Sequence, residues 1–550
     1  MPDQKLSDLI HDRLQQNPDS VAFVINNASI RISDFNLRIV AAVQWLRSEN
    51  IQRGDVVAVW MVNRLEWFVL LFAIARIGAT IVSVNTRYRS EELLHILQSS
   101  GARYLFTQSN YNRIDFLEIL GSLTQSQLPE LEKIILVGEQ NSVAQDPVGQ
   151  KPLASNPAWP VIHFSPSAVL ASEQASLQVS VQVSDESDPE AVVILFPTSG
   201  TTKAPKLVMH PQRTLTDHAR RCAAAYDLVA SDASLLTMLP VCGVFGLNAS
   251  LAALAGGAPV VLQESFDATE AGQLIQQHHI THTFGSDEMF NRLCEVFVQE
   301  IPFPSLRLCG FGAFTSSFSD SAKECWRRGV PLHGMYGSSE VLAIFSGQPS
   351  DLSLEQKIEG GGRPVAGLEA KVRIRDTHTG ELLPEGQSGE IEIQAPSQFI
   401  GYFRNEQETA RAHRDGYFVT GDLGHLRADG TLVYETRLGD AMRLGGHLVS
   451  PVEIEEVLKQ MPAVQDAHVV HTTIDGQPRA VAFVIAQPGQ QPDPERITAS
   501  LKSNIASYKV PARLWTVTEF PQTEGANGLK TSRVKLREIA IARIAAETVA

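Results

Sequence analysis

The sequence predicts an α/β protein with a large N-terminal part and a small α+β C-terminal part. Apolar stretches of strand length alternate with helical patterns in residues 1–130 and 191–365, which is typical of parallel sheets covered by helices. Residues 369–435 are instead rich in strands, and a compact α/β segment follows residue 440. A chain of 550 residues is too long for one hydrophobic core, so we expect several folding units.

The N-terminal part begins with a strand, a helix and a second strand. Residues 55–60 predict a strand, residues 65–77 predict an apolar helix that ends at Gly78, and residues 80–84 predict the next strand. Because the connections are short, we expect the two strands to pair in parallel. Residues 140–190 are rich in Ser, Gln, Pro and Ala and predict an irregular excursion between subdomains.

The stretch 235–262 contains no charged residue and is long enough to cross a membrane. Prolines and glycines interrupt it, so we expect a strand end, a loop, a buried helix and a second strand instead. Residues 370–375 and 389–394 alternate with period two, which predicts a small sheet or β-barrel-like module. In the C-terminal part we expect a helix over 451–461 and a strand over 480–486.

Composition narrows the class of protein. The formal net charge of −15 argues against a general nucleic-acid binder. The N-terminus lacks a basic region followed by an apolar one, so we expect no secretory signal. The cysteines show no metal-ligand spacing, which favours a cytoplasmic protein with free, mostly buried thiols. These cysteines are Cys222, Cys242, Cys294, Cys309 and Cys325.

The segment 197–206 is a candidate phosphate-binding loop. It follows a predicted buried strand over 192–196 and reads PTSGTTKAPK. Hydroxyls and backbone N–H groups can donate to a phosphate, glycine permits close approach of the backbone, and lysine adds a positive charge. The spacing is not that of a Walker A loop. The candidate residues are Thr198, Ser199, Gly200, Thr201, Thr202 and Lys206.

Five further motifs follow the loop in a fixed order. They are HGMYGSSE at 333–340, GYFVTGD at 416–422, RLGD at 437–440, GGHLVSPVEIE at 445–455 and GLKTSRVKLR at 528–537. In this order and spacing they resemble the adenylate-forming superfamily of acyl-CoA synthetases, luciferases and peptide-synthetase adenylation domains. RGDVVA at 53–58 and VNTRYRSEEL at 84–93 are similar to the acyl-CoA synthetase branch. The resemblance covers nearly the whole chain.

The resemblance implies a division into domains and a two-step reaction. It implies an N-terminal domain over residues 1–436, a hinge over 437–441 that contains Asp440, and a mobile C-terminal domain over 442–550. A carboxylate would attack the α-phosphate of ATP to give an acyl-adenylate and pyrophosphate, and a thiol, usually that of coenzyme A, would then displace AMP. ATP, Mg²⁺ and coenzyme A are therefore the implied cofactors. The small domain is expected to rotate between the two steps.

The resemblance also implies a role for each motif. Lys530 would bridge the substrate carboxylate and the α-phosphate, and Glu340 would bind Mg²⁺. Thr201 and Lys206 would act with them, in a loop that closes over the β- and γ-phosphates. Tyr336 would lie along the adenine, and Asp422, expected at a glycine turn that ends a strand, would accept the ribose hydroxyls. Further implied contacts are Ala313, Gly334, Met335, Gly337, Ser339 and Arg437 for the nucleotide, and Gly445 and Gly446 for the pantetheine arm.

The chain departs from the family pattern near two of these motifs. Lys203 and Leu207 stand where the phosphate loop usually has glycines, so we expect a stiffer loop. Leu529 separates the usual glycine from Lys530, although the spacing downstream of the lysine is intact. Lys530 therefore stays the preferred catalytic lysine, and Lys535 is the alternative.

The candidate acyl pocket is apolar. Cys242 and Gly243 stand where the family usually has an aromatic residue and a histidine, which predicts a wider pocket unless a neighbouring side chain fills the space. Residues 241–245 contain no aspartate, which argues against an α-amino acid substrate. We expect an apolar carboxylic acid, with a medium-chain acyl, aromatic or alicyclic group. The candidate lining residues are Cys242, Gly243, Phe245, Cys309, Gly310, Phe311, Gly312 and Ala313.

Two alternatives to a coenzyme A ligase stay open. An acyl-AMP ligase would load the phosphopantetheine of a separate carrier protein, because that thiol arm is the same as in coenzyme A. A catalytically silent nucleotide-binding module would fit the replaced loop glycines and Leu529. The resemblance is compatible with a monomer or a homodimer.

Overall fold

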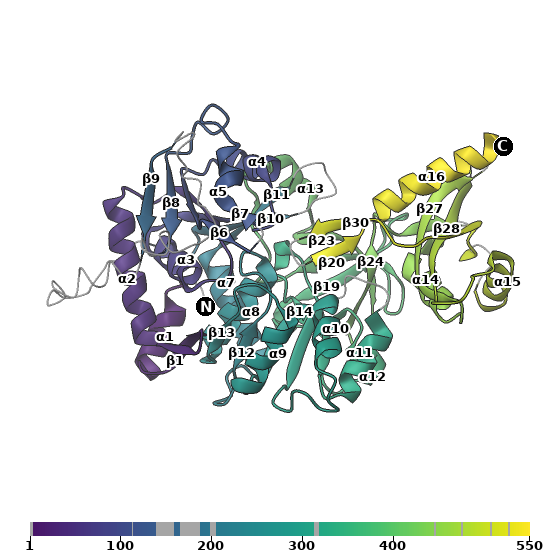
Figure 1. Cartoon of the computed structure of the whole chain (residues 1–550), viewed down its shortest axis with the longest axis horizontal. Helices are drawn as coiled ribbons and strands as arrows, with labels where there is room; N and C mark the ends of the chain where they lie inside the picture. The colour runs from purple at the N-terminus through teal and green to yellow at the C-terminus, as the bar shows by residue number, and fades with distance from the viewer. Residues whose placement is uncertain are drawn as a thin grey trace.

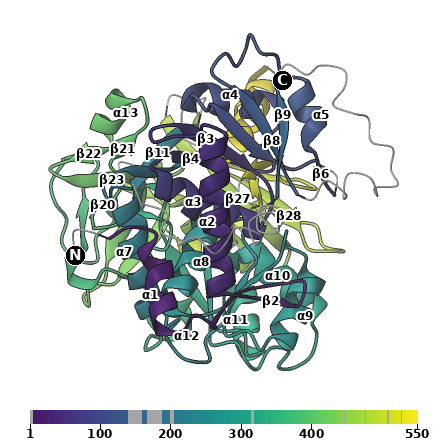
Figure 2. The same ribbon diagram turned by 90° about the vertical axis from the view of Figure 1, so that its left-hand side faces the viewer.

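The computed structural model describes residues 4–112, 114–138, 159–165, 187–198, 205–312, 318–444, 447–474, 477–505, 509–525 and 528–549. The small C-terminal part, with α14 to α16, lies at one end of the long axis, and α1 and α2 lie at the other end of the large part (Figures 1 and 2). The predicted excursion over 140–190 falls mostly outside the described residues.

The first sheet of the large part contains the predicted N-terminal strands. In order across the sheet its strands are β21 (Gly401–Tyr402), β11 (Lys206–Pro211), β10 (Val192–Thr198), β4 (Thr80–Ser83), β3 (Val56–Trp60), β5 (Tyr104–Thr107), β8 (Lys133–Val137) and β9 (Val161–Phe164). β3 and β4 pair in parallel, as predicted. β10 pairs in parallel with β4 and antiparallel with β11. The β10–β11 hairpin therefore holds the two ends of the candidate phosphate loop.

The second sheet forms one long path. Its strands in order are β19 (Lys371–Arg375), β20 (Gly389–Gln394), β23 (Tyr417–Leu426), β24 (Leu432–Arg437), β18 (Gly361–Pro364), β17 (Ser346–Gly347), β16 (Leu332–Tyr336), β15 (Leu308–Gly312), β14 (His282–Ser286), β12 (Leu235–Thr237), β13 (Val260–Leu262), β1 (Val21–Ile25) and β2 (Ala28–Arg31), with β22 (His413–Arg414) beside β23. The strand-rich segment predicted after residue 369 is thus an antiparallel continuation of the parallel strands β12 to β16.

Helices cover these sheets, and the apolar ones are the most deeply buried. α3 runs from Leu65 to Ile77 and ends at Gly78, whose φ of +74° is the left-handed conformation that glycine adopts without strain. The uncharged stretch 235–262 forms β12, α8 and β13, as predicted. None of the helices in the described ranges is both long and apolar enough to span a bilayer. The other helices of the large part are α1 (Asp8–Gln16), α2 (Ile32–Ser48), α4 (Ser90–Ser100), α5 (Phe116–Gly121), α7 (Gln212–Ala225), α8 (Val244–Gly256), α9 (Ala268–Gln277), α10 (Asp287–Val296), α11 (Phe318–Arg327), α12 (Leu354–Lys357) and α13 (Glu406–Arg411).

The small part has its own sheet and core. β27 and β28 form a long antiparallel pair, and β29 joins β28 in parallel. The predicted helix and strand correspond to α14 and β28. The elements are β25 (Met442–Leu444), β26 (His447–Val449), α14 (Pro451–Lys459), β27 (Val464–Ile474), β28 (Gln477–Ala486), α15 (Pro494–Asn504), β29 (Arg513–Thr516), β30 (Gln522–Gly525), β31 (Gly528–Thr531) and α16 (Arg533–Val549).

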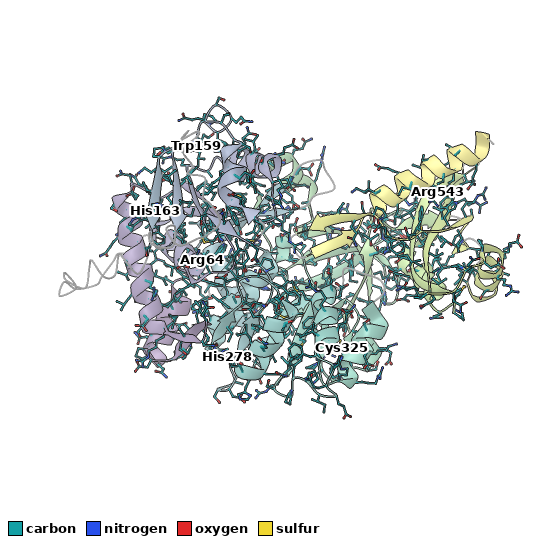
Figure 3. The ribbon with its side chains drawn as sticks, in the orientation of Figure 1. Arg64, Trp159, His163, His278, Cys325 and Arg543 are labelled. Carbon is teal, nitrogen blue, oxygen red and sulfur yellow. The ribbon has the colours of Figure 1, made fainter. Side chains whose placement is uncertain are left out.

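All five cysteines are buried and free, as the sequence predicts. Their spacing does not predict that Cys294 of α10 and Cys325 of α11 meet, with the two Sγ atoms 2.8 Å apart. Cys325 lies on the large part, in the region of α11 and α12 (Figures 1 and 3).

Candidate active site

Three of the predicted nucleotide-binding side chains are bonded directly to one another. The Tyr336 hydroxyl donates to Asp422 Oδ2 at 2.7 Å, and Arg437 Nη1 donates to Asp422 Oδ1 at 2.7 Å. Arg437 Nη1 also donates to the Thr420 carbonyl at 2.8 Å. Asp422 and Arg437 are register partners on β23 and β24, and Tyr336 ends β16. The long sheet therefore brings together residues that lie about a hundred positions apart in the sequence.

Asp422 is not at the end of a strand, contrary to the expectation from its glycine turn. It lies inside β23, which continues to Leu426. The pairing register with β20 shifts opposite this position, and Gly421 has a φ of +70°. An irregularity with a left-handed glycine redirects a strand without ending it. The motif thus marks a bend inside a strand that turns the carboxylate towards Tyr336.

The electrostatics of this cluster suit an acceptor of hydroxyl groups. Asp422 is only 5% exposed. Burial raises the pKa of Asp422 above its usual range, and the Arg437 guanidinium opposes that shift. Burial and the Asp422 carboxylate raise the pKa of Tyr336, so the tyrosine stays a hydrogen-bond donor. A carboxylate held by two donors still has lone pairs for further hydroxyls.

A second aromatic ring, which the sequence did not indicate, lies beside Tyr336. Tyr434 of β24 stacks on Tyr336 with ring centroids 5.4 Å apart and an interplanar angle of 29°. Tyr434 precedes Arg437 by three residues, at the end of the segment 369–435 that is predicted to be rich in strands, and that proximity was the available signal. Position 334, two residues before Tyr336, requires glycine, because a Cβ there would come within 1.8 Å of the Glu359 carbonyl oxygen. Met335, between Gly334 and Tyr336, is buried.

The backbone around Glu340 is tightly constrained. Ser339–Val341 form a short 3₁₀ helix, and the next two residues, Leu342 and Ala343, have φ of +63° and +59°. A Cβ on Gly337 would come within 1.8 Å of the Ala343 carbonyl, so this turn needs glycine. Positive φ at two successive non-glycine residues costs energy and is typical of functional sites.

Three contacts hold the segment that contains Glu340. The Tyr402 hydroxyl donates to Glu340 Oε1 at 2.9 Å, and the Phe399 N–H donates to the Glu340 carbonyl at 2.8 Å. His210 Nε2 lies 2.7 Å from the Ser339 carbonyl. Burial lowers the pKa of His210 to about 4, so the neutral ring donates through Nε2. A carboxylate with one donor keeps oxygen lone pairs for a hard cation, so Glu340 fits a Mg²⁺ ligand.

The base of the phosphate loop is held at both ends. Thr198 and Lys206 are register partners on β10 and β11. Lys206 Nζ bonds Glu408 Oε2 of α13 at 2.6 Å and lies 4.6 Å from the centre of the Tyr402 ring. Ser199, Gly200, Thr201, Thr202 and Lys203 lie outside the described residues, so their roles stay predictions.

The replacement of a glycine by Leu207 has a packing reason. Leu207 is the second residue of β11, is 3% exposed, and belongs to the apolar core beside α4. The Phe403 N–H donates to the Leu207 carbonyl at 2.8 Å. Leu207 is therefore part of a strand and not of a loop, contrary to the expectation from the family pattern. Glu408 and Tyr402 carry no local signal, because they lie about 200 residues after the loop.

The candidate acyl-pocket residues fall on two faces of the long sheet. Phe245 of α8 packs against Phe284 of β14, with ring centroids 6.0 Å apart. Phe284 pairs with Gly310, whereas Phe311 pairs with Gly285, so the alternation of side chains places Phe311 on the opposite face from Phe284.

Cys242 and Gly243 precede the helix that carries Phe245. The Cys242 carbonyl accepts a hydrogen bond from Ser83 Oγ at 2.6 Å, and Gly243 is the N-terminal cap residue of α8. Gly312 ends β15, and Ala313 lies outside the described residues. The structure thus brings Cys242, Gly243 and Phe245 together and separates them from Phe311.

The catalytic lysine predicted for the C-terminal part lies on a hairpin strand. The backbone of Lys530 pairs with Thr523 across β30 and β31. The proposed hinge follows β24 directly, where the Asp440 N–H donates to the Arg437 carbonyl at 2.9 Å. Gly445 and Gly446 lie outside the described residues. The domain boundaries and the position of the hinge stay predictions.

Comparison with known families and proteins places this chain among adenylate-forming enzymes. The family described as "AMP-binding enzyme" matches residues 10–403, and "AMP-binding enzyme C-terminal domain" matches residues 453–526. A 2-succinylbenzoate–CoA ligase of Geobacillus kaustophilus is 29% identical over 90% of this chain and 91% of its own length. A second ligase of that name, from Bacillus cereus, is 27% identical over 95% and 96%.

Solved structures show the same fold. The anthranilate CoA ligase AuaEII in complex with anthranoyl-AMP superposes with a TM-score of 0.80, at 23% identity over 99% of both chains. The Bacillus subtilis O-succinylbenzoate coenzyme A synthetase MenE in complex with AMP gives a TM-score of 0.73, at 22% identity over 96% of this chain and 97% of that one. The predicted fold class is confirmed.

Proposed function

The chain belongs to the AMP-binding enzyme family, in the CoA-ligase branch of the adenylate-forming superfamily, and from that premise we propose that it converts an apolar carboxylic acid to its coenzyme A thioester through an acyl-adenylate. As an acid–thiol ligase it uses ATP with Mg²⁺ and coenzyme A. The observation that carries the proposal is the bonded set of Tyr336, Asp422 and Arg437.

In the proposed first step, the large part holds the nucleotide and the small part supplies the positive charge of Lys530. Asp422 accepts the ribose hydroxyls, and the Tyr336 ring lies along the base. Lys206 must exchange its bond to Glu408 for the phosphates. Lys530 neutralises charge on the substrate carboxylate and the α-phosphate, which is the main need of such a substitution. Mg²⁺ held by Glu340 would neutralise phosphate charge when bound.

In the proposed second step, the thiol of coenzyme A attacks the acyl carbonyl and AMP leaves. Rotation about the hinge at Asp440 would remove Lys530 and bring Gly445 and Gly446 to the same site. Two bare glycines leave room for the narrow pantetheine arm.

Aromatic acids are the first substrates to test. Two relatives are named as ligases of 2-succinylbenzoate and anthranilate, both aromatic carboxylates. Phe245 and Phe284 form an edge-to-face pair, and aromatic side chains of this kind favour a planar apolar group. Medium-chain and alicyclic acids complete the panel.

The experiment is a pyrophosphate-release assay with ATP, Mg²⁺ and that panel. We expect release with at least one apolar acid, and its loss in Lys530→Ala because the charge at the α-phosphate is then unopposed. Full adenylation by Lys530→Ala would remove that lysine from the proposal. Lys502→Ala, at an exposed position of α15, is the matched control and should adenylate normally.

The acceptor separates the two remaining ligase functions. Thioester formed on free coenzyme A supports the proposed ligase, whereas thioester formed only on a holo carrier protein supports the acyl-AMP ligase. Binding of ATP without pyrophosphate release from any acid would favour the silent module.

A further inference from the structure

Glu455 and Arg533 form a buried ion pair in the small part that the proposed reaction does not use. Arg533 Nη1 donates to Glu455 Oε1 at 2.6 Å, and Nη2 donates to Oε2 at 3.0 Å. The Glu455 side chain is fully buried, and that of Arg533 is 14% exposed. Two parallel charge-assisted bonds fix the direction of a guanidinium as well as its distance.

Further contacts make this pair the centre of a network. The Val469 N–H donates to Glu455 Oε1 at 2.7 Å, and Arg533 Nη1 donates to the Val469 carbonyl at 2.7 Å. His468 Nδ1 lies 3.5 Å from Glu455 Oε1. Burial disfavours the charged form of Glu455, but His468 and Arg533 together keep its pKa below the usual range. The ionised carboxylate thus joins α14, β27 and the start of α16.

The network reaches both ends of the hairpin that carries Lys530. Phe520, just before β30, packs edge-on against His468 with ring centroids 4.5 Å apart. Arg533, just after β31, is bonded to Glu455. In the view of Figure 1 the β30–β31 hairpin, in yellow, projects from the start of α16 towards the large part.

The base of the hairpin is closed by its own bonds. The Ser532 N–H donates to the Pro521 carbonyl at 2.7 Å. Lys535 Nζ donates to the Gln522 carbonyl at 3.2 Å. The hairpin is therefore a short unit, and the contacts at its two ends help to set its orientation.

We propose that Glu455 is a positioning residue for adenylation: through Arg533 and His468 it fixes both ends of the β30–β31 hairpin and so sets the place of Lys530. This inference rests on the proposed function, in which Lys530 acts only in the first step. Displacement of a reacting group by about 1 Å can lower a rate about 100-fold. Loss of Glu455 should therefore slow adenylation while the pantetheine contact near Gly445 and Gly446 still operates.

The test is Glu455→Gln, because a glutamine oxygen can still accept from the Val469 N–H. We measure adenylation by pyrophosphate release, and thioester formation separately from synthetic acyl-adenylate and coenzyme A. We expect adenylation to fall about 100-fold and thioester formation to change little. Glu538→Gln, which removes an exposed carboxylate from α16, is the matched control and should behave as wild type.

A double variant separates an effect on the position of the β30–β31 hairpin from an effect on the stability of the fold. Glu455→Gln combined with Arg533→Met leaves no unpaired charge in the core, so Tm should recover relative to Glu455→Gln. Adenylation should stay low in the double variant, because the bonds that orient the hairpin are still missing.

Three results would overturn the inference: wild-type adenylation in Glu455→Gln, an equal loss of both half-reactions, or adenylation that recovers together with Tm. If the wild type itself releases no pyrophosphate, the proposed function fails and this inference fails with it. Normal release by the wild type with an unchanged Glu455→Gln overturns the inference alone.

Discussion

On the large part, the proposed nucleotide-binding side chains bond to one another, whereas on the small part Lys530 lies on a hairpin whose two ends contact the core of that part. Asp422 is fixed by Tyr336 and Arg437 within the site itself. The hairpin is fixed by Glu455 and its partners, which lie in the core of the small part. The difference indicates a division of labour: a preformed site for nucleotide affinity, and a movable group for the rate of one step.

Among variants of the nucleotide site on the large part, Asp422→Ala is expected to have the largest effect on ATP affinity. The change removes the ribose acceptor and leaves the Arg437 charge without its carboxylate. Hydrogen bonds to charged groups contribute about 1.5–3 kcal/mol, so affinity for ATP should fall by roughly 100-fold. Isothermal titration measures the affinity. Asp19→Ala, an exposed aspartate that pairs with Arg31, is the control. Unchanged ATP affinity in Asp422→Ala would remove this carboxylate from the nucleotide site.

His210→Gln should change the pH dependence of stability. The pKa of His210 in the folded chain, about 4, is below its ordinary 6.5 because burial disfavours the charge, so protonation favours unfolding. The neutral His210 ring makes its full contribution to the free energy of unfolding above pH 6.5. This contribution is lost as pH falls from 6.5 to 4, by at most about 1.4 kcal/mol per pH unit.

The measurement is the urea midpoint at pH 7 and pH 5 for wild type and His210→Gln. The wild type should lose about 2 kcal/mol more than the variant, because groups common to both cancel in the difference. Glutamine can still donate to the Ser339 carbonyl. His11→Gln, at an exposed position, should keep the wild-type dependence. Parallel curves for wild type and His210→Gln would show that burial of His210 does not set the slope.

Tyr336→Phe sharpens the comparison by removing one bond and keeping the stacked ring. ATP affinity should fall by about tenfold, since one hydrogen bond of roughly 1 kcal/mol or more is lost from Asp422. Tyr434→Phe keeps the other ring of the stack and serves as the matched control. An equal loss in both variants would mean that the effect is not specific to the bond between the Tyr336 hydroxyl and Asp422.

The smallest effect is expected from Glu408→Gln. This carboxylate holds Lys206 at 2.6 Å, and ATP phosphates must compete with it. A partly exposed ion pair contributes about 0.2–1 kcal/mol, so KM for ATP should fall by no more than about fivefold. Arg411→Gln removes the other partner of Glu408 and should leave KM unchanged. A rise in KM for Glu408→Gln would instead assign Glu408 to the positioning of Lys206.

The sequence predicted local patterns well and long-range contacts poorly. The helix ending at Gly78 and the strand before Thr198 follow from apolar runs and a glycine, which are local signals. Asp422, Tyr336 and Arg437 were found because each lies in a motif of its own. The bonds among them required the sheet order β23, β24, β18, β17 and β16, which no short segment encodes.

Other contacts of the site could not be predicted from sequence motifs. Tyr402 and Glu408 reach Glu340 and Lys206 across the fold, and only the structure brings them together. Glu455 and Arg533 both lie within motifs quoted from the sequence, yet nothing local indicates that they pair. The placement of Phe311 away from Phe245 likewise depends on strand register, where a shift of one residue exchanges the two faces.

One comparison of variants tests the division of labour most directly: ATP affinity and single-turnover adenylation rate for wild type, Asp422→Ala and Lys530→Ala. We predict that Asp422→Ala loses affinity, whereas Lys530→Ala binds ATP as the wild type does and loses the adenylation rate. A Lys530→Ala variant that adenylates at the wild-type rate, or that loses ATP affinity as strongly as Asp422→Ala, would contradict it.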